Sequence, residues 1–180
     1  MVNQKEIRLS GSGGQGLILG GIILAEAAIL DGNNAIQSQS YGPEARGGAS
    51  KAEVIISNEA IDYPKVDKAD LLLALTEVAY KKYIKTLKED GILIVDSSVN
   101  IEDKNPSYKV MQIPILDTAF EKMGKGMVAN IVALGVIREV TNVVSAESLE
   151  KAVLNRVPRG TEELNKKALM EGYLLASNRD

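Results

Sequence analysis

The chain has 180 residues, of which 45% are hydrophobic and 25% charged, and its formal net charge at pH 7 is −3. This length suits one domain with a core of its own, and the composition is that of an ordinary globular protein. It contains no cysteine and no histidine. Thiolate-held iron–sulfur clusters, zinc–thiolate sites, disulfides and histidine-based catalysis are therefore excluded for this chain alone.

Charge and hydropathy also restrict the expected partners and location. Positive and negative residues are interspersed, which argues against a nucleic-acid partner. The first ten residues carry charge but no apolar core of signal-peptide length, so we expect a cytoplasmic protein. The longest apolar run, Leu17 to Leu30, contains Gly20, Gly21 and Glu26 and is too short to cross a bilayer. We expect it to form a buried helix, with no membrane contact.

The first third of the chain mixes strand and helix patterns. Glu6–Ser10 alternates as a strand, and Gln15–Leu30 has the pattern of a helix. Asn34–Gln39 and Lys51–Ser57 are the next expected strands. Only a turn-rich loop separates these two strands, so we do not expect a standard crossover between them.

From Asp70 onward the pattern is that of an α/β protein with added helices. Thr118 and Glu121 have capping-box spacing, which predicts a short helix that ends at Gly124. The expected strands are residues 70–75, 92–98 and 108–115, and the other expected helices are residues 77–89, 127–140, 146–157 and 162–177. We therefore predict a single domain over residues 1–180: an α/β, Rossmann-like, doubly wound and mostly parallel sheet with extra C-terminal helices.

A glycine-rich loop joins the first expected strand to the first helix. Gly11, Gly13 and Gly16 match G-x-G-x-x-G in the context typical of phosphate binding. In this interpretation Gly11 permits a tight turn, Gly13 lets backbone approach a ligand, and Gly16 allows close helix packing. Backbone N–H groups at the helix start favour an anion. The predicted anion site is Gly11, Ser12, Gly13, Gly14, Gln15 and Gly16. The alternative is that the glycines only form a tight strand–helix junction.

The loop does not by itself indicate a nicotinamide dinucleotide. An NAD site places a carboxylate about 20 residues further on, at the end of the second strand. Asp31 precedes that strand and Glu44 lies beyond it, so neither fits. Arg46 is also too far along the loop to be assigned to an NADP phosphate. A stand-alone NAD(P)- or flavin-dependent oxidoreductase remains the alternative function.

Four segments together resemble one family. They are "SGSGGQG" (Ser10–Gly16), "SYGPEARGGAS" (Ser40–Ser50), "ILIVDSS" (Ile92–Ser98) and "NIVALG" (Asn130–Gly135). The chain resembles the gamma subunit of 2-oxoacid:ferredoxin oxidoreductases from Ile7 to about Ala176. The string "YGPEARGG" is the most specific part, and it is most similar to the 2-oxoglutarate (2-oxoglutarate synthase) type. Indolepyruvate enzymes and other 2-oxoacid enzymes carry a similar domain and are an alternative.

The resemblance implies a multisubunit enzyme that converts a 2-oxoacid, coenzyme A and oxidised ferredoxin into acyl-CoA, CO2 and reduced ferredoxin. It implies alpha, beta and ferredoxin-like delta partner subunits, which hold thiamine diphosphate, magnesium and iron–sulfur clusters. This chain would hold no cofactor alone and would not be active alone. It would contribute a surface for coenzyme A beside the active site.

The loop after the second expected strand is the predicted contact with those partners. Pro43 fixes a turn, and glycines on both sides let the chain run close to another surface. Arg46 suits bidentate contact with a carboxylate or phosphate. The predicted interface loop is Tyr41, Gly42, Pro43, Glu44, Arg46, Gly47 and Gly48. The alternative is a solvated loop with an internal contact between Glu44 and Arg46.

Three further residues are weaker site candidates. Asp96 and Ser97 end a buried strand, at the edge where open α/β sheets bind ligands. Capping of the next element is the alternative role for Asp96. Asn130 lies early in a helix and could direct its amide at the site, or it could serve only in packing or capping. We predict no catalytic residue and no metal ligand in this chain, and an assembly subunit whose glycine loop binds nothing is the third functional alternative.

Overall fold

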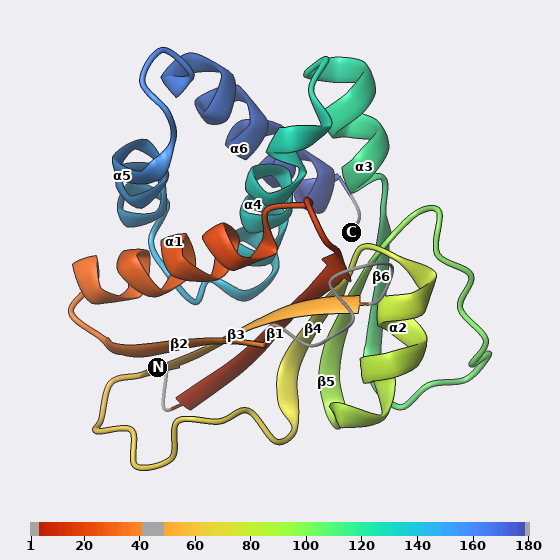
Figure 1. The fold of residues 1–180 in the computed structure, drawn as a ribbon. Helices are drawn as coiled ribbons and strands as arrows, with labels where there is room; N and C mark the ends of the chain where they lie inside the picture. Colours follow the sequence, from red (N-terminus) through yellow and green to blue (C-terminus); the bar gives the residue numbers. More distant parts are fainter. Residues whose placement is uncertain (1–3, 41–48, 179–180) are drawn as a thin grey trace.

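A computed structural model describes residues 4–40 and 49–178. Its centre is a six-stranded sheet in the order β2-β3-β1-β4-β5-β6, with helices on both faces (Figure 1). The strands are β1 (Gln4–Ser12), β2 (Asn34–Ser40), β3 (Ala49–Ser57), β4 (Ala69–Ala74), β5 (Leu87–Asp96) and β6 (Lys109–Ile113).

The strand directions confirm the predicted α/β class. β1, β4, β5 and β6 form consecutive parallel pairs. β3 is antiparallel to both of its neighbours, β1 and β2. β2 and β3 are antiparallel neighbours, which agrees with the prediction that they are not joined by a standard crossover. One reversed strand in an otherwise parallel sheet brings the end of β2 and the start of β3 to the edge where β1 ends: Ala49 pairs with Ser12.

The helices follow the predicted order. They are α1 (Leu17–Leu30), α2 (Glu77–Tyr83), α3 (Ile115–Asp117), α4 (Ala129–Thr141), α5 (Ala146–Arg156) and α6 (Glu162–Ser177), with short turns η2 (Ile84–Thr86), η3 (Thr118–Lys122) and η4 (Gly126–Val128). Side chains cap two of them in the usual way, since Thr76 accepts from Ala79 N–H and Ser145 accepts from Ser148 N–H. Among the described residues, no helix has the length and apolar character that a membrane span requires.

Two predicted helix boundaries were wrong. The helix expected over residues 77–89 ends at Tyr83, because the Thr86 hydroxyl donates to the Tyr83 carbonyl oxygen at 2.6 Å, and Leu87 already pairs with Ala69 in the sheet. The capping box at Thr118 does not form. Thr118 is buried inside a helical segment that begins at Ile115, and its first turn is capped from a distance by Asp96.

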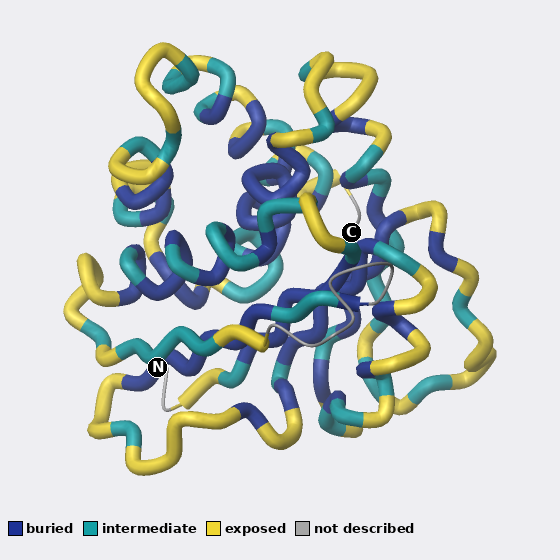
Figure 2. The backbone as a smooth tube through the Cα atoms, viewed as in Figure 1, coloured by how far each residue is buried: buried dark blue, intermediate teal, exposed yellow. Residues whose placement is uncertain are grey.

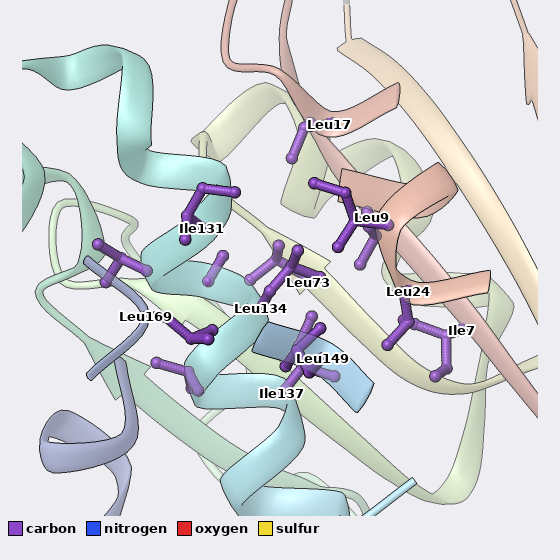
Figure 3. Close-up of a cluster of buried hydrophobic side chains, with 14 of the residues drawn as sticks. Ile7, Leu9, Leu17, Leu24, Leu73, Ile131, Leu134, Ile137, Leu149 and Leu169 are labelled. Carbon is purple, nitrogen blue, oxygen red and sulfur yellow. The ribbon is translucent and has the colours of Figure 1, made fainter. Parts of the chain in front are cut away.

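The core lies in two layers, one on each face of the sheet. On one face, Ile7, Leu9 and Leu73 pack against α1 and α4 (Figure 3). On the other, Leu72 and Leu93 pack against Tyr80 of α2. The nine residues from Ala129 to Ile137 are all buried, so this part of α4 is enclosed among the sheet, α1 and α6 (Figure 2). The apolar run from Ile131 to Ile137 fits this burial, and the last four residues of α4, Arg138 to Thr141, are partly exposed.

α4 and α6 cross with their backbones in contact. A Cβ atom added to Gly135 would lie 2.9 Å from the Gly172 Cα atom, and one added to Gly172 would lie 2.8 Å from the Gly135 Cα atom. Both distances are shorter than any side chain tolerates. The pair of glycines therefore fixes how closely the C-terminal helix approaches the centre of α4.

Candidate functional site

The glycine loop lies at the carboxyl edge of the parallel strands, between β1 and α1 (Figure 1). β1 continues through Ser12, so Gly11 lies in the strand opposite Ser50 and not in the turn. The turn itself uses Gly14, with φ of 87°, and Gly16, with φ of 70°. These values lie in the left-handed region that favours glycine. The tight-turn role that the sequence motif assigns to Gly11 therefore belongs to Gly14.

Gln15 folds back over the start of the loop. Its Oε1 atom accepts a hydrogen bond of 2.8 Å from the Ser12 backbone N–H. A Cβ atom on Gly11 would lie 2.2 Å from the same Oε1 atom, so a side chain there would displace the Gln15 amide. The Ser12 backbone N–H is thus not available to an anion, and the Gln15 side chain stabilises the loop from inside.

The start of α1 leaves its first N–H groups open. Gly16 is the N-cap, no side chain caps the helix, and its first turn has no acidic residue. The first N–H groups of an α-helix have no partner within the helix. Together with the helix dipole they form a site suited to an anion such as a phosphate.

Asn130 joins this loop to the start of α4. Its Nδ2 atom donates to the Gly16 carbonyl oxygen at 3.0 Å, and its Oδ1 atom accepts from Ile131 N–H at 2.9 Å. The side chain is buried, with 4% of the residue exposed. The sequence placed Asn130 near the site, and the structure shows that its amide contacts the loop backbone.

Asp96 lies at the same sheet edge but is occupied by structural contacts. Its Oδ1 atom accepts from the backbone N–H and the hydroxyl of Ser98, at 2.9 and 2.6 Å, and its Oδ2 atom accepts from Leu116 N–H at 2.8 Å. These contacts match the capping alternative. Ser97 is exposed beside it, with its backbone N–H bonded to the Ile113 carbonyl. β4 separates β5 from β1, so these residues are not part of the glycine loop's immediate surroundings.

The predicted interface loop, Tyr41 to Gly48, lies outside the described residues. The strand residues on either side of it are described. Ala49 pairs with Ser12, and Ser40 pairs with Lys51. The loop therefore begins and ends at the sheet edge that carries the glycine loop.

A buried charge cluster that was not predicted from the sequence lies on the α2 face of the sheet. Arg8 is 3% exposed, and its Nε atom donates to Glu53 Oε1 at 2.7 Å. The Lys51 Nζ atom lies 2.7 Å from the same oxygen. Arg8, Lys51 and Lys82 also lie 5.7, 6.0 and 5.5 Å from the centre of the Tyr83 ring.

The contacts of this cluster indicate a structural role. Arg8 Nη2 donates to the Val66 carbonyl at 2.8 Å, and Arg8 Nη1 contacts the Thr86 hydroxyl. The guanidinium thus joins β1 to β3, to η2 and to the segment before β4, and its side chain is 4% exposed. The available signal was Arg8 within "EIRLS" and Glu53 within "KAEVI". These charges become informative only when the two strands are known to pair with Arg8 opposite Glu53.

Comparisons with known proteins agree with this fold. The family model for pyruvate ferredoxin/flavodoxin oxidoreductase matches residues 6–175. The chain is 53% identical over 176 residues to the 2-oxoglutarate synthase subunit KorC of Methanocaldococcus jannaschii, covering 96% of this chain and 94% of that protein. It is 52% identical to the gamma subunit of a keto/oxoacid ferredoxin oxidoreductase from Geobacter sulfurreducens, with a TM-score of 0.87, covering 97% of this chain and 99% of that one.

A third relative is much longer. The 2-oxoglutarate:ferredoxin oxidoreductase from Magnetococcus marinus, solved with 2-oxoglutarate, coenzyme A and succinyl-CoA bound, is 25% identical with a TM-score of 0.89. The match covers 99% of this chain but 32% of that one. These relatives confirm the resemblance to the gamma subunits, and the 2-oxoglutarate type is the best supported among them. They are members of oxidoreductase complexes, and the chain belongs to the pyruvate ferredoxin/flavodoxin oxidoreductase family.

Proposed function

We propose that this chain is the gamma subunit of a cytoplasmic 2-oxoglutarate:ferredoxin oxidoreductase and supplies part of its coenzyme A site. The similarity to 2-oxoglutarate synthase subunit KorC over 96% of the chain carries this proposal. The open start of α1 adds physical support, because coenzyme A is an anion with three phosphates and this helix start has no competing carboxylate.

The glycine loop is the part of the chain that fits the phosphates best. Gly13 and Gly14 are exposed at the turn, and the first N–H groups of α1 follow directly after Gly16. The related enzyme from Magnetococcus marinus was solved with coenzyme A bound, and this chain matches that protein over 99% of its own length. We place the phosphates against Ser12, Gly13, Gly14 and the start of α1.

The remaining chemistry belongs to partner subunits in this proposal. Iron–sulfur clusters need thiolate ligands, and the chain has no cysteine. Thiamine diphosphate with its magnesium ion would supply the decarboxylation, and the clusters would pass two electrons to ferredoxin. This chain would bind and orient coenzyme A, and its loop from Tyr41 to Gly48 would contact the alpha and beta subunits.

Purification from the source cell tests the proposal. A tagged chain is expected to bring at least two other subunits, one of them rich in cysteine, and the assembly is expected to reduce ferredoxin with 2-oxoglutarate only when coenzyme A is present. Calorimetric titration with coenzyme A, NADH and NADPH separates the alternatives. Recovery of a lone chain that binds NADH or NADPH tightly and turns over would support the stand-alone oxidoreductase instead.

Gly13→Val tests whether the loop contacts the ligand. A branched side chain at this exposed turn blocks backbone approach to a phosphate, so we expect KM for coenzyme A in the assembled enzyme to rise at least about tenfold, with KM for 2-oxoglutarate unchanged. Gly13→Ala should give a smaller rise. Unchanged coenzyme A kinetics in both variants would favour a purely structural loop.

A further inference from the structure

We propose that Asn130 is the positioning residue of the glycine loop: it sets the affinity for the anionic ligand by holding the Gly16 carbonyl, without touching the ligand. The inference rests on the proposed coenzyme A function and adds to it a residue from a distant helix. Asn130 is 4% exposed and lies at the start of α4, while Gly16 precedes α1.

The orientation of the Asn130 amide is fixed by two different partners. Nδ2 donates to the Gly16 carbonyl oxygen at 3.0 Å, and Oδ1 accepts from Ile131 N–H at 2.9 Å. A flipped amide would face an acceptor with its oxygen and a donor with its nitrogen, and would lose both bonds. The amide is therefore a rigid bridge between α4 and the loop.

The peptide unit between Gly16 and Leu17 connects this bridge to the part of the loop where we place the ligand. The Gly16 carbonyl and the Leu17 N–H belong to one planar peptide unit and point in opposite directions. Leu17 N–H is the first open donor of α1. A hydrogen bond that fixes the carbonyl therefore also fixes the direction of this donor. The same carbonyl accepts from Gly20 N–H at 2.9 Å, which ties the plane to the helix as well.

Gly16 and Asn130 are matched in shape. A Cβ atom on Gly16 would lie 2.7 Å from Asn130 Nδ2 and 3.0 Å from its Cγ atom. Gly16 also has φ of 70°. The missing side chain of Gly16 thus makes room for the Asn130 amide as well as permitting the left-handed turn, so that a side chain at position 16 would displace the bridge.

Asn130→Asp is the most specific test, because it replaces the side-chain amide by a carboxylate of nearly the same shape. The carboxylate still accepts from Ile131 N–H, and a negative charge at the start of α4 favours that helix. It cannot donate to the Gly16 carbonyl, and it adds a negative charge beside the anion site. We expect KM for coenzyme A in the assembled complex to rise at least about tenfold, with kcat at saturating coenzyme A within about twofold of wild type.

Asn165→Asp is the matched control. Asn165 is 5% exposed, and its Nδ2 atom donates to a backbone carbonyl, that of Thr161, at 2.9 Å. It lies on α6, away from the loop, so the same substitution there should leave KM for coenzyme A unchanged. Asn130→Ala removes the bridge without adding charge and should give an intermediate rise. Gly16→Ala combined with Asn130→Ala should be no worse than Gly16→Ala alone, because the added Cβ already displaces the amide.

The outcomes separate this inference from the proposed function. Variants are compared at equal amounts of assembled complex, measured by size-exclusion chromatography. Wild-type KM for coenzyme A in both Asn130 variants, or equal losses of kcat in the Asn130 and Asn165 variants, would overturn the positioning role and leave the proposed function intact. A wild-type complex that needs no coenzyme A would overturn the proposed function and this inference with it.

Discussion

Glu53 shows how one buried carboxylate can determine the packing of several strands. Arg8 from β1 and Lys51 from β3 both reach its Oε1 atom at 2.7 Å, and the Ser38 hydroxyl from β2 lies 3.5 Å from Oε2. Glu53 is 7% exposed, so these partners replace water as its source of hydrogen bonds. The contacts of Glu53 thus connect β1, β2 and β3 on the face of the sheet that packs against α2.

Removing this carboxylate should be costly. Glu53→Ala leaves the Arg8 guanidinium buried without a counter-ion, so we expect the free energy of unfolding to fall by about 3 to 5 kcal/mol, measured by urea denaturation. Glu102→Ala is the control, because its ion pair with Lys81 is exposed and screened by solvent, so a far smaller loss is expected. Equal losses in the two variants would contradict the structural role of the Arg8–Glu53 pair.

Individual site residues could be predicted from the sequence unevenly. The position of the glycine loop between the first strand and the first helix could be predicted, because the spacing of the glycines is a local signal, whereas for Asn130 the sequence left both a site role and a packing or capping role open. The bridge between them joins residues far apart in the chain, and no local pattern reports such a contact. The Arg8–Glu53 pair was missed for the same reason, since its two charges come together only through the antiparallel register of β1 and β3.

The crossing of α4 and α6 depends on two glycines. A Cβ atom on Gly172 would lie 2.2 Å from the Val132 carbonyl oxygen, and one on Gly135 would lie 2.4 Å from the Leu169 carbonyl oxygen. Neither obstacle is the end of a flexible side chain. The two helices must therefore separate to admit even one methyl group, and α4 cannot separate without disturbing the core.

Gly172→Ala should therefore destabilise the protein, despite the higher helix propensity of alanine. We expect the free energy of unfolding to fall by about 1 to 3 kcal/mol, the usual effect of overpacking. Gly20→Ala in α1 is the matched control, because its Cβ would meet Leu9 at an ordinary 3.6 Å. There the gain in propensity should stabilise by up to about 1 kcal/mol. A stabilising Gly172→Ala in the same thermal or urea unfolding assay would contradict the close helix contact.

Element type was easier to predict than element boundaries. The order of strands and helices followed from the apolar periodicity, and the antiparallel pairing of β2 and β3 agreed with the short loop between them. The amphipathic pattern of residues 77–89 ran across the end of α2 into β5, because lysines and leucines there suit either structure. Thr118 has the sequence of a cap, but a distant carboxylate, Asp96, caps that turn.

In the molecule as a whole, α5 is held against α1 by two carboxylates. Asp31 accepts from the Ser145 backbone N–H and hydroxyl, both at 2.6 Å, and Glu26 accepts from Arg156 at 2.5 Å and from Asn155 at 2.9 Å. Partial burial acts to raise the pKa of each group. The hydrogen bonds outweigh it, so the pKa of Asp31 lies below its ordinary value of 3.8 and that of Glu26 below 4.5.

These lowered pKa values predict an acid-sensitive contact between the two helices. Because protonation is harder in the folded state, the stabilisation is present above the unfolded pKa values and is lost as pH falls through the folded ones. The double variant Asp31→Asn, Glu26→Gln should be less stable than wild type at about pH 7, and the difference should shrink below about pH 4. Urea denaturation at several pH values measures this. A difference that does not change with pH would contradict it, and Asp62→Asn in an exposed loop is the control.

The contact between Gly135 and Gly172 also bears on the moment, during synthesis of the chain, at which the glycine loop becomes supported. The glycine loop leaves the ribosome early, with β1 and α1. Its bridge comes from Asn130 on α4, and α4 is covered only when α6, the last described helix, has emerged and docked. A nascent chain therefore carries the loop long before the loop is supported. Full affinity of the loop for its ligand is therefore expected only after α6 is complete.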